Sequence, residues 1–179
     1  MRIFLTGVAC VGKTTIGAKL ASLLGHQFFD LDLEIEKFFD TSIERLRDRY
    51  LTQHSFRAEA ARALTHLLAL DRSADLVIAL PPSGLIGGYW KVVKNVPKCT
   101  IVVLQDTPEN ILKRITFYDI DSRRMRKKLT DRERLFYLRE IKRDITYFRR
   151  SYQRAHIAVD IAGCCPYEAA LRIKERIIR

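Results

Sequence analysis

A glycine-rich segment near the start of the chain contains the residue types that bind phosphate groups. Residues 7–14 read GVACVGKT and fit the pattern G-x-x-x-x-G-K-[ST] with no mismatch. Gly7 and Gly12 let the backbone fold around phosphates with no Cβ atom in the way. Lys13 stands where it reaches the β- and γ-phosphates of a nucleotide, and the Thr14 hydroxyl stands where it ligates Mg²⁺. The segment therefore predicts a loop that binds ATP together with Mg²⁺.

The residues around this segment give it the context that such a loop requires. Residues 3–6 are apolar and predict a short strand before it, and residues 14–24 have helical periodicity after it. A strand, a loop and a helix in this order distinguish a phosphate-binding loop from a chance glycine turn. Successive backbone N–H groups and the helix N-terminus then face the anion. We expect Val11 and Thr15 to take part in this binding with the residues named above.

Two carboxylates follow the second predicted strand, residues 27–29. Asp30 and Asp32 are separated by one residue, and ligands of doubly wound sheets bind beyond the carboxyl ends of the strands. One carboxylate can hold Mg²⁺, and the other can orient or deprotonate an acceptor hydroxyl. Helix capping by the same residues is the alternative interpretation. We expect Asp30 to be the metal ligand, with Asp106, after a later strand, as the second candidate.

The apolar residues of the whole chain alternate between strand and helix patterns. Five apolar runs predict strands, at residues 3–6, 27–29, 75–80, 100–105 and 157–161. Helical spacing predicts helices at residues 14–24, 33–39, 43–51, 56–70 and 166–178. Further helix starts are indicated by capping boxes at residues 41–44 and 130–133 and by a proline at position 108. Strands that are apolar throughout are buried on both faces, which predicts a three-layer α/β/α fold with a five-stranded parallel sheet. The length of the chain predicts one domain, residues 1–179.

The basic residues are concentrated in the second half of the chain. Lys and Arg number 32 against 21 Asp and Glu, which gives a formal net charge of +11. Residues 113–154 contain 15 basic and six acidic residues. This field attracts anions, and three interpretations stay open: a lid over nucleotide phosphates, the solvated face of a long helix, or contact with nucleic acid. Nucleic acid is the least expected partner, since no RNA-binding aromatic motif accompanies the run.

The composition limits the class of protein. No run approaches 18 apolar residues, which excludes an ordinary transmembrane helix. Met1 and Arg2 lead directly into the first predicted strand, without the apolar core and cleavage site of a signal peptide. The four cysteines form no C-x-x-C pair and are expected to be free thiols. We therefore expect a cytoplasmic protein with no membrane partner, as a monomer or weak homodimer.

The first 57 residues resemble the shikimate kinase family of small P-loop kinases. The shared features are the first strand with its phosphate-binding loop, FFDLD at residues 28–32, EIEK at residues 34–37, and Phe56-Arg57. The resemblance implies a nucleoside-monophosphate-kinase-like fold with a mobile lid. It also implies Mg²⁺-dependent transfer of the γ-phosphoryl group of ATP to a hydroxyl of a small anionic acceptor, most simply shikimate.

The resemblance also implies roles for single residues of the acceptor site. Asp30 would lie on the Mg²⁺ side, while Asp32 would contact the substrate hydroxyls and is the candidate base. Arg57 would clamp the substrate carboxylate, for which the planar guanidinium is suited. Arg149 matches a second substrate arginine of the family, with Arg150 and Arg154 as alternatives in a neighbouring register.

The second half of the chain resembles the family more loosely. Arg114 matches the arginine that stacks on adenine, and Pro166 matches the proline on the other face of the adenine. The lid is expected at roughly residues 117–130. There, Arg123 is the expected counterpart of the arginine that closes over the phosphates, with Arg124 as its alternative.

The chain departs from the family on the acceptor side. Residues 79–84 read ALPPSG where the family has three consecutive glycines, one of which binds the substrate carboxylate through its N–H. Proline has no N–H, so the contact cannot be made in the same way. Ala60 also replaces a glutamate of the family, with Glu59 one position earlier. Two alternatives therefore stay open: a kinase of another acceptor (a nucleoside, nucleotide or sugar acid), or a nucleotide-binding module that has lost its acceptor site.

Overall fold

Five parallel strands form the centre of the fold. The computed structural model describes residues 1–70 and 75–178. The strands lie in the order β2-β3-β1-β4-β7, and all four neighbouring pairs are parallel. Their bounds are β1 Arg2–Thr6, β2 Gln27–Asp30, β3 Leu76–Ala79, β4 Cys99–Gln105 and β7 Ile157–Asp160. All five predicted strands are present, and the expected fold class is confirmed.

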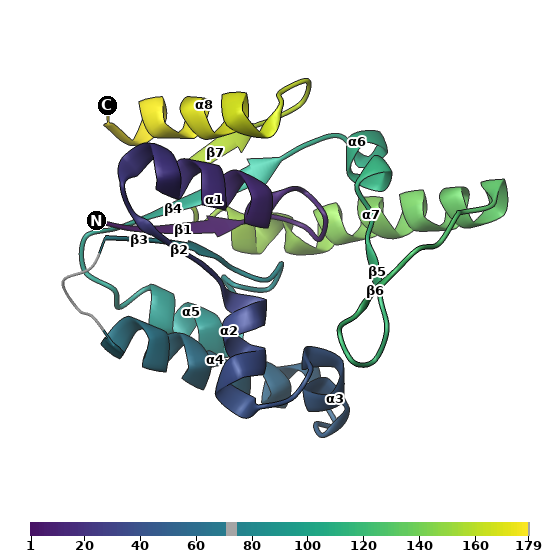
Figure 1. Ribbon diagram of the computed structural model, residues 1–179, viewed down its shortest axis with the longest axis horizontal. Helices are drawn as coiled ribbons and strands as arrows, with labels where there is room; N and C mark the ends of the chain where they lie inside the picture. The colour runs from purple at the N-terminus through teal and green to yellow at the C-terminus, as the bar shows by residue number, and fades with distance from the viewer. Residues whose placement is uncertain (71–74, 179) are drawn as a thin grey trace.

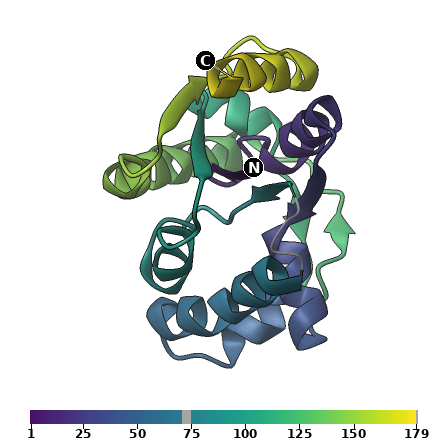
Figure 2. The ribbon, with the colours of Figure 1, turned by 90° about the vertical axis from the view of Figure 1, so that its left-hand side faces the viewer.

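Helices cover both faces of this sheet (Figures 1 and 2). On one face, α1 and α8 pack against each other. On the other face, α4 packs against α2 and α5. The bounds are α1 Lys13–Leu24, α2 Leu31–Phe39, α3 Ile43–Asp48, α4 Gln53–Leu70, α5 Gly87–Val93 and α8 Pro166–Ile178. This arrangement places the starts of α1 and α2 at the carboxyl edge of the sheet, where ligands of such folds bind.

The central strand divides the core into two parts. Ile3 and Leu5 of β1 belong to the apolar cluster that contains the buried residues of α1 and α8. Phe4, between them, belongs to the cluster that contains the buried residues of α2, α4 and α5. Because successive side chains of a strand point to opposite faces and both faces are covered, all three central residues of β1 are apolar. Helices on both faces therefore hold the end of β1 and the start of the loop that follows it.

Two further helices and a hairpin follow β4. Helix α6 spans Pro108–Lys113, the hairpin strands are β5 Phe117–Tyr118 and β6 Arg124–Met125, and helix α7 spans Asp131–Tyr152. The hairpin descends from α6 toward α3, and the first part of α7 extends beyond the sheet (Figure 1). The buried residues of α7 are Ile141, Phe148 and Ser151, all in its second half. The predicted lid region therefore forms an antiparallel hairpin and the chain that leads into α7.

One of the two predicted capping boxes is confirmed and the other is wrong. At α7, the Thr130 hydroxyl accepts from Glu133 N (3.3 Å) and the Glu133 carboxylate accepts from Thr130 N (2.9 Å). At α3, the N-cap is Ser42 and not Thr41, and Ser42 Oγ accepts from Arg45 N. Thr41 is unavailable because its N–H donates to Glu36 O and closes the end of α2.

Within the residues that the structure describes, no helix is long and apolar enough to cross a membrane. All four cysteines lie in this part of the chain and are free, as expected.

Candidate active site

The glycine-rich loop connects the central strand to α1, as its pattern predicts. Its backbone takes the left-handed region at Gly7 (φ 144°), Cys10 (φ 59°) and Gly12 (φ 111°). Gly12 is the N-cap of α1 and has no side chain to satisfy the first N–H groups of the helix. These groups have no acceptor within the helix itself and are available to an anion.

Lys13 places its ammonium group inside this loop. Its Nζ donates to the carbonyl oxygens of Gly7 and Val8, both at 2.9 Å. Burial lowers the pKa of Lys13, whereas the carboxylates of Asp32 and Asp30 raise it. The candidate phosphate-binding lysine and the two carboxylates predicted from the sequence are therefore close enough to interact.

The end of β2 is joined to the start of α1 by a hydrogen bond between side chains. Thr14 Oγ1 donates to Asp30 Oδ2 at 2.5 Å. The other oxygen, Asp30 Oδ1, accepts from Asp32 N at 3.1 Å and caps α2. The capping interpretation of Asp30 is thus confirmed, and the cap fixes the carboxylate so that its second oxygen faces Thr14.

These residues fit a nucleoside triphosphate with Mg²⁺. The loop offers backbone donors and a lysine to phosphates, while Thr14 and Asp30 offer a hydroxyl and a carboxylate oxygen to a hard cation. Over residues 1–70 and 75–178, no three His, Cys, Asp or Glu side chains gather into a metal site. Two oxygen donors, from Thr14 and Asp30, are typical of Mg²⁺, which in nucleotide sites binds one or two protein oxygens together with phosphates.

Asp32 has an unusual carboxyl group. Burial and the neighbouring charge of Asp30 raise its pKa to about 6, while Lys13 and Arg47 lower it. The group is ionised at neutral pH, with a pKa closer to neutrality than that of an exposed carboxylate. This is the property that a general base needs.

We expect the Asp32 carboxyl carbon to titrate near pH 6 in an NMR experiment on the nucleotide-free protein. The Lys13→Ala variant should titrate at a higher pH, because the lysine charge favours the ionised carboxylate. Lys19→Ala, an exposed position on α1, is the matched control and should leave the titration unchanged. Titration of Asp32 near pH 4 would contradict the interpretation of Asp32 as a buried carboxyl group with a raised pKa.

Asp106, the second metal candidate, is occupied by other contacts. Its side chain is 1% exposed and accepts hydrogen bonds from Asn110 Nδ2 (2.9 Å), Thr107 N (2.7 Å) and the Arg114 guanidinium. Burial opposes its charge, but these donors together lower its pKa. The carboxylate therefore orients Arg114, the candidate adenine contact at the end of α6. Pro166, the other adenine candidate, is the exposed first residue of α8.

On the acceptor side, four side chains from four helices interact electrostatically. Tyr89 of α5 is buried; its pKa is raised by burial and by Asp32, and lowered by Arg57 of α4 and Arg47 of α3. Gly88 allows α5 to lie close to α4, since a Cβ at this position would lie 2.6 Å from Arg57 O. The predicted residues Asp32 and Arg57 are thus brought together, and the structure adds Tyr89 and Arg47, which the sequence analysis missed.

The proline segment after β3 is held from α7. Tyr152 Oη donates to Pro82 O at 3.1 Å, and Gly84 N donates to Pro81 O at 2.8 Å. Burial raises the pKa of Tyr152, so its hydroxyl stays a donor. The segment therefore has a fixed conformation, although neither proline offers an N–H group.

Arg149 lies on α7 and lines a hollow of about 540 Å³, together with Val8, Gln105, Tyr152 and other residues of β4 and α7. Arg57 is not among the described residues that line this hollow. The alternative Arg154 stacks over Trp90 and donates to Leu85 O.

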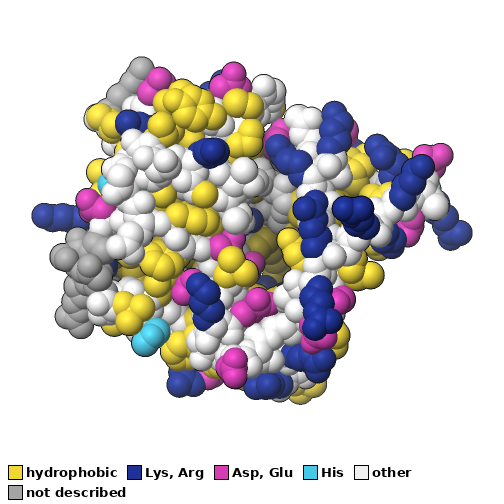
Figure 3. All heavy atoms as spheres, in the orientation of Figure 1, with side chains coloured by type: hydrophobic (Ala, Val, Ile, Leu, Met, Phe, Trp, Pro, Cys, Tyr) yellow, Lys and Arg dark blue, Asp and Glu magenta, His cyan; other side chains and the backbone are white. Residues whose placement is uncertain are grey.

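The tip of the hairpin rests on α2 and α3. Ser42 Oγ donates to Ile120 O at 2.5 Å, Arg45 Nε pairs with Asp121 at 2.8 Å, and the Ser122 hydroxyl donates to Glu36. In Figure 3, the face is hollowed between this hairpin and the body of the molecule, and Lys and Arg side chains gather over the hairpin and the adjoining part of α7. The hairpin thus has the position of a lid.

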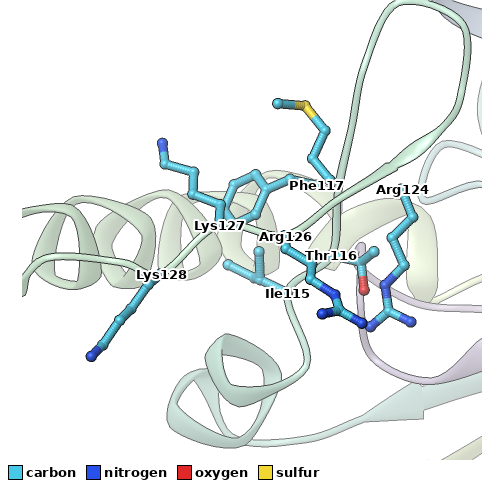
Figure 4. A pocket seen from close by; sticks show the side chains of 8 residues that line it. Ile115, Thr116, Phe117, Arg124, Arg126, Lys127 and Lys128 are labelled. Carbon is cyan, nitrogen blue, oxygen red and sulfur yellow. The ribbon is translucent and has the colours of Figure 1, made fainter.

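The base of the hairpin forms an open hollow of about 760 Å³. Arg124 and Arg126 line it with Thr116, and Figure 4 shows the two guanidinium groups on the same side as Thr116. Arg123 instead lies in the turn, where its N–H and carbonyl pair with Asp119. The residues that line the hollow therefore include Arg124 and not Arg123.

Comparison with known proteins identifies the family. The sequence profile described as "Shikimate kinase" matches residues 9–177. The chain belongs to the shikimate kinase family. The shikimate kinase of Persephonella marina is 29% identical over 176 residues, which are 98% of each chain. That of Chlorobium phaeobacteroides is 36% identical over 116 residues, 64% of this chain but only 55% of that protein. A pentafunctional AROM polypeptide of Yarrowia lipolytica is 43% identical over 77 residues, 5% of its length.

Solved structures show the same fold over the whole chain. The shikimate kinase of Bacteroides thetaiotaomicron has a TM-score of 0.79 at 22% identity and covers 100% of this chain and 99% of its own. That of Acinetobacter baumannii, solved in complex with shikimate, has a TM-score of 0.75 at 24% identity and covers 99% and 92%. A gluconokinase of Sinorhizobium meliloti has a TM-score of 0.61 at 17% identity and covers 99% and 95%. At these identities the likeness establishes the architecture, and the acceptor must be argued from the site.

Proposed function

We propose that this protein is a kinase that transfers the γ-phosphoryl group of Mg·ATP to a hydroxyl group of shikimate. The proposal depends on one observation: the phosphate-binding loop and the candidate base meet at a single place. Thr14 donates a hydrogen bond to Asp30, and the carboxylates of Asp32 and Asp30 both raise the pKa of Lys13. A phosphoryl donor held by the loop and a hydroxyl held by Asp32 would therefore be adjacent, which supplies most of the catalysis in phosphoryl transfer.

The chain's own residues would divide the work as follows. The loop, Lys13 and the N-terminus of α1 bind phosphates, while Thr14 and Asp30 hold the cation that neutralises them. Asp32 orients the acceptor hydroxyl and takes its proton. Arg57 holds the acceptor carboxylate, and Arg149 of α7 is the second candidate for this carboxylate.

Arg114 and Pro166 would enclose the adenine, and Asp106 fixes the direction of the Arg114 guanidinium. We assign the lid contact to the phosphates to Arg124, because it lines the hollow under the hairpin while Arg123 is held in the turn.

The test is ADP production from Mg·ATP by the purified protein, with and without shikimate. Shikimate-dependent turnover supports the proposal and shows that the proline segment is compatible with this substrate. Binding of ATP without shikimate-dependent turnover overturns shikimate as the acceptor and retains the nucleotide site.

Pro81 and Pro82 favour a second candidate, a kinase of another small anionic hydroxy compound such as a sugar acid. Neither residue can donate an N–H to the carboxylate in the way the family's glycines do. A screen of hydroxy acids, sugar acids and nucleosides in the same assay decides between the candidates.

Arg57→Ala is expected to raise KM for shikimate by about 10- to 100-fold, because a charge-assisted hydrogen bond to the carboxylate is lost. KM for ATP should stay unchanged, since Arg57 lies on α4, in the layer opposite α1. Arg62→Ala on the same helix is the matched control, since Arg62 is exposed and pairs with Glu59. Steady-state kinetics with each substrate varied in turn provide the measurement, and equal effects on both KM values would remove Arg57 from the acceptor site.

A further inference from the structure

Arg47 of α3 has a guanidinium group that is fixed on two sides. Its NH1 donates to both carboxylate oxygens of Glu44, at 2.9 and 3.2 Å. Its planar group lies over the ring of Phe56, with Cζ 5.5 Å from the ring centroid. These contacts hold the side chain in one orientation.

The Nε–H of Arg47 is buried without a partner. Within the part of the chain that the structure describes, neither Arg47 Nε nor Arg57 Nε has a hydrogen-bond partner, and both are inaccessible to solvent. A buried donor without an acceptor is unfavourable, and most buried polar groups are paired. Phe56, the ring on which Arg47 stacks, precedes Arg57 on α4.

Both arginines act on the acceptor side of the site. Arg47 and Arg57 each stabilise the ionised form of Tyr89, and Arg47 also stabilises the ionised form of Asp32. Two guanidinium groups thus lie on this side of the site, one of them within electrostatic reach of the candidate base, and the Arg47 side chain is 41% exposed. Such positive groups are what an anionic group of a substrate requires.

The proline segment leaves the acceptor side with fewer backbone donors. Pro81 and Pro82 offer no N–H, and the Pro82 carbonyl accepts from Tyr152. A carboxylate that loses a backbone donor there needs another donor to replace it, and a guanidinium edge can supply it.

We propose that Arg47 is a substrate-binding residue that shares the acceptor carboxylate with Arg57 and so selects anionic acceptors. This inference rests on the proposed function, because it concerns the same carboxylate.

The experiment measures shikimate binding by titration calorimetry in the presence of Mg·ADP. Arg47→Met removes the charge and the donors while keeping an apolar stem over Phe56, and it should weaken shikimate binding by about tenfold or more. Arg49→Met, an exposed arginine at the end of the same helix, is the matched control and should bind like the wild type. The affinity for Mg·ADP should be the same in all three proteins.

A second readout separates binding of the carboxylate from a structural role. The methyl ester of shikimate lacks the charge, so the wild-type protein should bind it far more weakly than the acid. Arg47→Met should reduce the ratio of the two affinities by about tenfold, because it weakens binding of the acid selectively. A merely structural role would weaken both ligands equally.

The outcomes distinguish this inference from the proposed function. If Arg47→Met keeps the wild-type affinity and the wild-type ratio, Arg47 is not a substrate-binding residue and the proposed function stands. If the wild-type protein neither binds nor phosphorylates shikimate, the proposed function and this inference are both overturned. Should Arg47→Met fail to fold, Arg47→Gln, which keeps a polar side chain without the charge, is measured by the same two criteria.

Discussion

Replacing Asp32 with Asn should lower kcat for shikimate phosphorylation by about 10²- to 10⁴-fold, the range ascribed to general acid–base groups. The amide keeps the size of the side chain but cannot accept the hydroxyl proton. Wild-type kcat should rise with pH through about 6, where Asp32 loses its proton. The residual activity of the Asn variant should lack this rise, since no carboxylate remains to titrate.

The matched control is Glu34→Gln on the same helix, where Glu34 is half-buried and pairs with the exposed Lys37 at 2.7 Å. It should leave kcat and its pH profile unchanged. Binding of Mg·ADP to the Asp32→Asn variant, followed by calorimetry, shows whether the nucleotide half of the site is intact. An unchanged kcat in this variant would show that Asp32 is not the general base and has only a structural role in the first turn of α2.

Replacing Lys13 with Ala should lower kcat by about 10²- to 10³-fold, the effect of removing one donor from developing transition-state charge. The ammonium group lies inside the loop, 2.9 Å from the carbonyl oxygens of Gly7 and Val8, so it meets any phosphate that the loop binds.

Lys19→Ala removes a lysine from the exposed side of the same helix and should leave kcat unchanged. Stopped-time assays of ADP release, with both substrates saturating, measure the effect. Full kcat in Lys13→Ala would contradict the role of the loop as the phosphoryl-transfer site.

The sheet could be predicted from the sequence because each of its five strands contains consecutive apolar residues. Such runs are typical of a parallel sheet between two helix layers, but they do not define the order of the strands. The phosphate-binding loop could be predicted because its function depends on backbone conformation, which glycine spacing encodes directly. The capping box at residues 41–44 failed because α2 uses the Thr41 N–H for its own C-terminal hydrogen bond, a competition that the local pattern does not contain.

The acceptor side could be predicted only in part, because it is assembled from four helices. Residues 45–49 read RLRDR, and nothing in that pattern separates Arg47 from its two neighbours; packing against Phe56 does. Gly88 likewise has no local role and is explained by the close approach of α5 to α4. The choice between Arg123 and Arg124 depends on the phase of a two-residue strand, which the sequence does not define.

The contacts of the hairpin tip would connect movement of the proposed lid to the helices beneath it. To open as such a lid, the hairpin would have to break its bonds to Glu36, Ser42 and Arg45, which belong to the same two helices that carry Asp32 and Arg47. A ligand that orders these helices therefore also favours the closed hairpin, and by thermodynamic reciprocity the closed hairpin binds that ligand more tightly. Exclusion of water from the phosphates is thereby linked to the presence of an acceptor, which would limit wasteful hydrolysis of ATP.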